Sequence, residues 1–363
     1  MSELVSQIAL DLIPGIGNHG VKQLISYCGS AHEVFNAPKK KLLKIPGVGE
    51  KLAKLIVNSK SFSAAEEIIS KTEKMEAGIL HYTDKEYPER LKNTPDAPNL
   101  IYVKGPGILN PSRCIAIVGA RKATEYGKRI TEKIISDLRE LDVTIVSGLA
   151  YGIDIQAHKA CMNNKLPTLA ILAGGLDMIY PSTHKKYAEE LQNTGAILTE
   201  SIPGTKPDRH LFPARNRIIA GMTDATVVVE AAEKSGALIT AHIADSYNRT
   251  VFAVPGNVGN NYSEGTNRLI ASQKALIYTG VEDLIYHLNW DIDQGEKPLQ
   301  TIPDLPEEEK LIFELLSKEN EPIEIDLIAI KTQIPINKVA SLLLNLEFQN
   351  LIKSLPGKKF GLK

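Results

Sequence analysis

The sequence has few of the features that mark a secreted, membrane or metal-binding protein. Its three cysteines, Cys28, Cys114 and Cys161, have no metal-ligand spacing and leave one unpaired, so we expect reduced thiols and no bound metal. The N-terminal residues carry acids and no basic segment before an apolar run, unlike a signal peptide. No stretch approaches the roughly 18 consecutive apolar residues of a membrane helix. These absences predict a soluble, cytoplasmic protein that does not enter a membrane.

Motifs of cofactor-dependent and hydrolytic enzymes are also missing where they would be needed. The glycine turn in IAIVGARKATEYG, residues 115–127, lacks the dinucleotide spacing G-x-G-x-x-G, and the sequence has no P-loop, H-E-x-x-H or G-x-S-x-G motif. A dinucleotide site also needs an acid near the end of the second strand, where this sequence has Ser147 and Gly148. We therefore predict no cofactor and no catalytic residue.

Positive charge is distributed unevenly along the chain. The formal net charge is −1, which favours no class of partner. Arginine, however, occurs only between Arg90 and Arg268, and lysine supplies the positive charge on both sides of that region. Because the planar guanidinium suits bidentate anion binding, we interpret the middle of the chain as a region that binds phosphate or carboxylate. A chance distribution beside lysine-rich flanks is the alternative.

The pattern along the chain predicts three domains. Residues 1–75 read as a helical domain in which LIPGIGNHGVKQLI resembles KIPGVGEKLAKLIV, and both resemble helix-hairpin-helix motifs. Residues 76–290 begin with a proline-rich connector and continue as an alternation of strands and helices. Residues 291–306 read as a linker, and residues 307–363 as three helices and two short strands, the pattern of a winged-helix domain.

The middle domain contains short apolar runs rich in Val and Ile, separated by helical patterns. The runs are IAIV, VTIV, TLAILAG, AILTES, ATVVVE and TVFAVPG, with LIYVKG before them in the connector. Strands that are apolar along their whole length are buried on both faces, which is typical of a parallel sheet covered by helices. We therefore predict a doubly wound α/β fold.

Small residues follow most of these strands, at the sheet edge where such folds bind ligands. Any one glycine turn is explained by tight strand-to-helix geometry, but several at one edge indicate a groove. Helix N-termini beneath the turns favour an anion. The candidate binding residues in these turns are Gly119, Ala120, Arg121, Lys122, Gly148 and Gly174.

The segment HLFPARNRIIAG, residues 210–221, and the residues just before it combine cations with aromatic rings, and Tyr151 and Tyr180 add rings in neighbouring loops. Two arginines two positions apart do not face each other on a helix, so we place them at a helix start, fanned around an anion. Cations that meet phosphates and rings that stack on bases suit single-stranded nucleic acid. The alternative is that the arginines pair with Asp208, Asp224 or Glu230 and tie loops down. The candidate contacts are Lys206, Arg209, Phe212, Arg215, Asn216 and Arg217.

Several stretches together resemble the DNA-processing protein A (DprA/Smf) family. They include DKEYPERLKN, IAIVGARKATEYG, IVSGLAYGIDIQAHKAC, AILAGGLDMIYPSTH and FPARNRIIAGMTDATVVVEAAEKSGALITAHIA, and cover roughly residues 80–280. The resemblance implies an extended Rossmann-like fold and a homodimer that binds single-stranded DNA. It also implies loading of a RecA-type recombinase during natural transformation, without established catalysis. Gly119-Ala120-Arg121 matches the family's turn, with alanine where serine is frequent, and Arg215-Asn216-Arg217 matches its Arg-Asn-Arg motif.

Two other functions compete with single-strand binding. The middle domain also resembles nucleotide-cleaving enzymes of the lysine-decarboxylase-like group, but the strand ATVVVE is not followed by their Pro-Gly-Gly, which leaves Glu230 and Glu233 without that setting. A dimeric scaffold with an empty groove is the third possibility. DNA contact by the helical domain is left open, and the winged-helix domain, with a net charge of −1, favours a protein contact.

Overall fold

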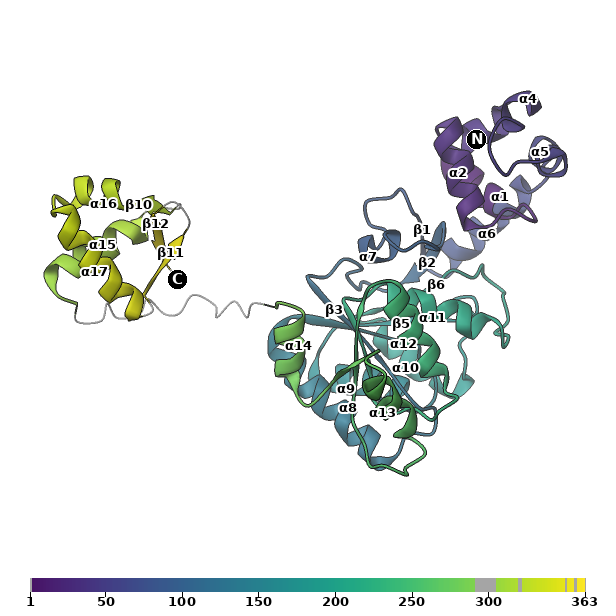
Figure 1. Cartoon of the computed structure of the whole chain (residues 1–363). Helices are drawn as coiled ribbons and strands as arrows, with labels where there is room; N and C mark the ends of the chain where they lie inside the picture. Colours follow the sequence, from purple (N-terminus) through teal and green to yellow (C-terminus); the bar gives the residue numbers. More distant parts are fainter. Residues whose placement is uncertain (1, 291–304, 319–321, 350, 356–357, 363) are drawn as a thin grey trace. The chain divides into compact units, whose positions relative to one another are not determined.

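The computed structural model describes residues 2–290, 305–318, 322–349, 351–355 and 358–362 (Figure 1). The chain divides into two compact units, Met1–Trp290 and Asp291–Lys363. All but the last two residues of the predicted linker 291–306 lie outside the described residues. The further division of the first unit at residue 75 stays a prediction.

The N-terminal part of the first unit is helical, as the sequence predicts. Side chains cap two of its helices, because the hydroxyls of Ser2 and Ser30 accept hydrogen bonds from the first-turn N–H groups of α1 and α3. The second helix of each repeat begins after a glycine, Gly17 or Gly49, with no side-chain cap. The helices are α1 (Glu3–Asp11), α2 (Asn18–Cys28), α3 (Ala31–Asn36), α4 (Lys39–Leu42), α5 (Glu50–Val57) and α6 (Phe62–Lys74).

A nine-stranded sheet forms the rest of the first unit, in the order β1-β2-β6-β5-β4-β3-β7-β8-β9. Neighbouring strands from β6 to β9 pair in parallel, whereas β1–β2 and β2–β6 are antiparallel. The strands are β1 (Gly78–His81), β2 (Leu100–Lys104), β3 (Arg113–Val118), β4 (Val143–Ser147), β5 (Thr168–Ile171), β6 (Ala196–Thr199), β7 (Ala225–Val228), β8 (Thr250–Ala253) and β9 (Leu276–Ile277).

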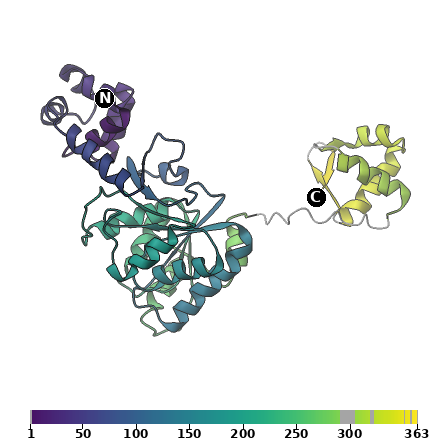
Figure 2. The ribbon, with the colours of Figure 1, turned by 180° about the vertical axis from the view of Figure 1, so that it is seen from behind.

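Helices cover both faces of this sheet (Figures 1 and 2). They are α7 (Glu89–Lys92), α8 (Glu125–Asp137), η1 (Leu138–Leu141), α9 (Ile153–Asn164), η2 (Ser182–His184), α10 (Lys185–Leu191), α11 (Leu211–Gly221), α12 (Gly236–Ser246), α13 (Glu264–Ala271) and α14 (Val281–His287). Because side chains alternate along a strand, β3 sends Ala116 to one face and Ile115 and Ile117 to the other. The sheet is therefore buried on both faces, as its apolar strands predict.

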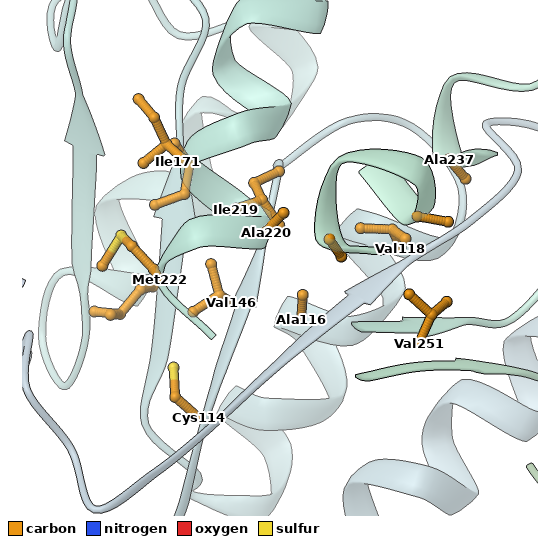
Figure 3. Close-up of a cluster of buried hydrophobic side chains, with 14 of the residues drawn as sticks. Cys114, Ala116, Val118, Val146, Ile171, Ile219, Ala220, Met222, Ala237 and Val251 are labelled. Carbon is orange, nitrogen blue, oxygen red and sulfur yellow. The ribbon is translucent and has the colours of Figure 1, made fainter. Parts of the chain in front are cut away.

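Different helices fill the two faces. On the first, α11 and α12 pack Ile219, Ala220 and Ala237 against Ala116 and Val118 of β3, as Figure 3 shows. On the second, α8, α9 and α14 cover the middle of the sheet. The N-terminal helices α1 and α6 join α10 on this second side, over β2, β5 and β6. The helical N-terminal part thus shares a core with the sheet.

The second unit is a small helical bundle with a three-stranded sheet, in the order β10-β12-β11. Its core contains Ile312, Ile328, Val339, Leu343 and Leu346. This arrangement is a winged-helix fold. Its elements are α15 (Glu307–Lys318), β10 (Ile323–Glu324), α16 (Ile325–Thr332), α17 (Ile336–Phe348), β11 (Ile352–Leu355) and β12 (Lys359–Leu362).

The predicted fold class is confirmed, and the structure contains three short strands that were not predicted. β9 and β10 have two residues each, and β1 has four residues at the sheet edge, too few for a periodic pattern. Among the described helices, none alone is long and apolar enough to cross a membrane. The pair α16 and α17 passes that test only together, with a bend of 108° between them.

Candidate nucleic-acid interface

The crevice of this sheet lies between β3 and β7. The chain proceeds from β3 to β4, β5 and β6 in one direction and from β7 to β8 and β9 in the other, so the two strands flank the point where the order reverses. Open α/β sheets bind ligands outside the carboxyl ends of the strands at such a point. The predicted turn of Gly119, Ala120, Arg121 and Lys122 directly follows β3 and therefore stands at this crevice.

Close packing against the start of α9 shapes the Gly119 turn. The N–H of Ile153 donates to the carbonyl of Ala120 at 3.2 Å, and a side chain added at Gly119 would lie 2.5 Å from Ile153. Gly152 has a φ of +78°, and any side chain there would collide with the carbonyl of Ala120. The turn therefore buries Ala120 and leaves Arg121 and Lys122 exposed to solvent.

Three segments meet beside Arg121. The Arg121 guanidinium lies 5.2 Å from the ring centroid of Phe212, in the first turn of α11, an arrangement that attracts cation to ring. The Phe212 ring in turn meets Tyr180 edge to face, with centroids 5.6 Å apart. Tyr180 belongs to the loop after β5 and is 50% exposed. One cation and two rings, from the loops after β3 and β5 and the start of α11, thus form a single, partly exposed cluster.

The loop over residues 200–210, which carries Lys206 and Arg209, packs on the loop after β5. The N–H of Gly175 donates to the carbonyl of Thr205 at 2.9 Å, and a side chain at Gly174 would lie 3.0 Å from the ring of Pro207. Gly174 thus supports the loop from below, and both cations project from it into solvent. The structure places Lys206 and Arg209 between the end of β6 and the start of α11.

Arg215 does not reach the surface. Its side chain is 4% exposed, and Nη1 donates to the carbonyls of Gly148, at the end of β4, and Ile171, at the end of β5. A side chain at Gly148 would lie 2.5 Å from this guanidinium. Gly148 and Arg215 were both predicted as binding residues. In the structure the glycine provides space for the arginine, which connects two strand ends.

Asp154 is the buried counter-charge of Arg215. Burial raises the pKa of the Asp154 carboxyl, while the Arg215 guanidinium and the N–H groups of Ala150 and Gly148 act in the opposite direction. Burial likewise lowers the pKa of Arg215, to about 10, against the attraction of Asp154. Arg215 therefore stays charged at neutral pH, beside a buried carboxyl.

Arg217 points away from α11 in a different direction from Arg215, because residues two positions apart in a helix are rotated by about 200° around its axis. Its guanidinium contacts the carboxylate of Glu200 and the carbonyl of Asp96, and its side chain is 13% exposed. Asn216 donates from Nδ2 to the carbonyl of Gly236 at 3.4 Å. The expectation that the two arginines fan around an anion at a helix start is wrong, because α11 already begins at Leu211.

The alternative that arginines tie loops together therefore holds for Arg217, with other partners than those named from the sequence. Asp224 pairs with Arg90 at 2.6 Å. Glu230 accepts from the N–H of Thr124 at 3.0 Å and from its hydroxyl at 2.5 Å. Thr124 is the N-cap of α8.

Glu230 fills the place that a cofactor phosphate takes in many α/β proteins. It follows β7, is 3% exposed, and lies so close to Gly127 in the first turn of α8 that a side chain at Gly127 would collide with it. A helix N-terminus at the switch point favours negative charge. Here the protein's own carboxylate supplies that charge, and Glu230 is committed to the N-terminus of α8.

Two exposed tyrosines that the sequence places in neighbouring loops were not included among the candidate contacts. Tyr180 contacts Phe212, and Tyr151, which follows β4, is 45% exposed. Both stand in glycine-rich loops after predicted strands, so the rule that selected Gly148 and Gly174 would also have selected them. Among the described residues, no group of three or more His, Cys, Asp or Glu side chains is arranged to hold a metal ion.

Comparison with known protein families gives three matches along the chain. Residues 78–289 match the model of DNA recombination-mediator protein A. Residues 296–358 match the DprA winged-helix domain, and residues 8–59 match a SAM-like helix-hairpin-helix tandem.

Individual relatives agree with these matches. Protein Smf of Synechocystis sp. is 33% identical, over 99% of this chain and 98% of the relative. The crystal structure of DprA from Streptococcus pneumoniae superposes with a TM-score of 0.67 at 29% identity, over 79% of this chain and 98% of that one. DNA processing protein A from Helicobacter pylori, whose structure concerns its single-stranded DNA binding mode, gives 0.54 at 29% identity, over 60% and 97%.

Proposed function

Because the chain belongs to the DNA recombination-mediator protein A family, we propose that it binds single-stranded DNA along the carboxyl edge of its sheet. Arg121, Lys122, Lys206 and Arg209 supply positive charge to phosphates, and Phe212 supplies a ring on which a base stacks. The N–H groups of the Gly119 turn add hydrogen-bond donors at the point where the DNA passes closest to the protein backbone.

The cluster of Arg121, Phe212 and Tyr180 carries this proposal. A guanidinium held over one ring, which in turn meets a second ring, presents a cation and stacking surfaces within one nucleotide's reach, on two loops and the start of α11. This combination is what binds single strands without base-specific hydrogen bonds. The relative from Helicobacter pylori, described for its single-stranded DNA binding, supports the same substrate class.

The buried members of the predicted site have a different part in this proposal. Arg215 and Gly148 hold the ends of β4 and β5 together, Gly174 supports the Lys206 loop, and Arg217 fixes α11 to the segment that contains Asp96. They act on DNA only through the loops that they position. Their substitution is expected to change stability before it changes affinity.

The family description as a recombination mediator supports a further step. We propose that the protein works as a cytoplasmic homodimer, without catalysis, and loads a RecA-type recombinase onto the bound strand. The commitment of Glu230 to the N-terminus of α8 leaves no free carboxylate of the nucleotide-cleaving kind at that position. Faster recombinase filament growth on single strands covered by a single-strand-binding protein would support loading, and unchanged growth would refute it.

Titration of labelled oligonucleotides tests the DNA site. We expect the wild type to prefer single over double strands and to lose affinity steeply with salt as counterions are released. Arg121→Ala should weaken binding by about 10- to 100-fold, the range for hydrogen bonds to charged groups. Lys133→Ala, an exposed cation on α8 that pairs with Asp137, is the matched control. Equal affinity of wild type and Arg121→Ala would overturn the proposed site.

A further inference from the structure

A stripe of aromatic and basic side chains extends away from Arg121 over α9 and α10. We define the α9–α10 stripe as Tyr151, His184, Tyr187 and Lys159. The rings of Tyr151 and His184 meet edge to face at 5.0 Å, and those of His184 and Tyr187 at 6.2 Å. The Lys159 ammonium lies 4.4 Å from the Tyr187 centroid. The stripe is therefore one continuous set of contacts.

The stripe begins next to the proposed DNA site. Tyr151 precedes Gly152, the residue that packs against the carbonyl of Ala120 in the Gly119 turn. From there α9 runs away from the sheet edge, and at about 1.5 Å per residue Lys159 lies about 9 Å along the helix from its first residue, Ile153. Single-stranded DNA that extends from Arg121 in this direction meets the exposed ring of Tyr151 first and the ammonium of Lys159 next.

His184 holds Tyr151 in place. It is buried, and because the carbonyl of Leu149 can only accept, Nδ1 of His184 is the donor in their 2.8 Å hydrogen bond. Leu149 has a φ of +56°, a conformation that a leucine adopts only when its surroundings hold it there. The bond therefore fixes the loop that presents Tyr151, whose hydroxyl lies 3.5 Å from Thr183.

The opposite side of the crevice, past β7, carries exposed carboxylates that make it less attractive to a phosphate. Past β7 the exposed Glu233 pairs with Arg268, which neutralises that cation, and the exposed Glu264 begins α13. Tyr126 stands on this side too, with its hydroxyl bound to the carbonyl of Pro255 at 3.0 Å. Exposed cations lie on this side as well, Lys234 and Arg129, whose guanidinium is 6.0 Å from the Tyr126 centroid. The carboxylates repel a passing phosphate, which favours a path of the DNA toward α9 and α10.

We propose that the α9–α10 stripe is a second segment of the single-strand track, in which Tyr151 stacks on a base and Lys159 meets a phosphate. This inference rests on the proposed DNA site at Arg121 and gives that site a direction. His184 is a positioning residue in it, since it acts on the strand only through the loop of Tyr151.

Oligonucleotide length separates the two segments. Oligothymidylates of about 6 and about 16 nucleotides lie toward the lower and upper ends of common single-strand site sizes. Tyr151→Ala should lose about 5- to 100-fold in affinity for the long oligonucleotide, the range for one lost stacking contact, and little for the short one. Tyr151→Phe should bind as the wild type does. Lys159→Ala should reduce the salt slope for the long oligonucleotide by about 0.7, the value for one phosphate on a single strand.

Matched controls make each outcome decisive. Tyr126→Ala removes a comparable exposed tyrosine on the opposite side of the crevice, and Lys133→Ala removes a cation from α8; both should bind as the wild type does. If Tyr126→Ala loses affinity and Tyr151→Ala does not, the direction is reversed and the inference is wrong. If wild type and stripe variants bind both lengths equally, the stripe is not a track. If the wild type binds neither length, the proposed function itself fails.

Discussion

The Gly119 turn and the Arg215–Arg217 segment both place arginine near the carboxyl edge of the sheet, and their arginines end in opposite environments. Arg121 is exposed and rests on the ring of Phe212. Arg215 is buried between two strand ends, and Arg217 is paired with Glu200. The first segment is a turn that projects from the sheet, whereas the second lies inside a helix packed on it. Proximity of arginine to a ligand edge therefore does not by itself indicate ligand contact.

The largest expected effect concerns the buried arginine. Arg215→Ala leaves Asp154 buried without its counter-charge, so we expect the free energy of unfolding to fall by about 3–5 kcal/mol. Arg121→Ala should change it by less than about 0.5 kcal/mol, because that side chain is exposed. Urea unfolding of both variants measures the difference. Comparable stability of the two variants would remove the distinction between the segments.

The histidine next to Arg215 makes stability depend on pH. Burial, followed by the charge of Arg215, lowers the pKa of His158 to about 3. As the pH falls below about 6.5 the unfolded chain binds this proton and the folded chain does not, so stability is lost, at up to about 1.4 kcal/mol per pH unit. Burial raises the pKa values of Asp154 and Glu200, which act in the opposite direction.

A variant isolates the contribution of the histidine from that of the acids. His158→Gln cannot take up the proton, so its free energy of unfolding should fall less steeply than that of the wild type between pH 7 and pH 5. Urea unfolding at several pH values in this range gives both slopes. Parallel slopes would mean that His158 is not kept neutral beside Arg215.

The last test concerns Glu230 at the N-terminus of α8, the helix that follows the Gly119 turn. Glu230→Ala removes the acceptor for Thr124 and the negative charge at the start of α8, at a cost of about 1–2 kcal/mol. Inorganic phosphate should then raise the melting temperature of this variant more than that of the wild type, because an anion can fill the vacated position. Glu233→Ala, at an exposed carboxylate nearby, is the control. An equal response of wild type and Glu230→Ala would show that the carboxylate does not stand in for a phosphate.

The hydrophobic pattern of the sequence was sufficient to predict the architecture. The strands from β3 to β8 are almost continuously apolar, and burial on both faces is the arrangement that keeps such strands from water. The same logic missed β1 and β9, since short strands at the edge of a sheet have no pattern long enough to read. The winged-helix unit was found because three helical patterns are followed by two short strands around a Pro-Gly turn.

The candidate site divides in the same way. The turn after β3 could be identified because its position depends only on local order, a strand followed by small residues and then a helix. The environment of Arg215 could not, because Gly148 and Ile171 are 67 and 44 residues away in the chain. The role of Glu230 depends likewise on Thr124, 106 residues away.

The sequence by itself determined the family, the fold class and the edge of the sheet that we propose as the binding site. Those properties follow from residue patterns within short windows, where periodicity and turn chemistry act. Only the tertiary structure decided which cations face solvent, that Glu230 occupies the N-terminus of α8, and that Tyr151 leads to a line of rings over α9 and α10. These depend on which distant segments pack together, and burial then commits a charged side chain to a partner inside the protein.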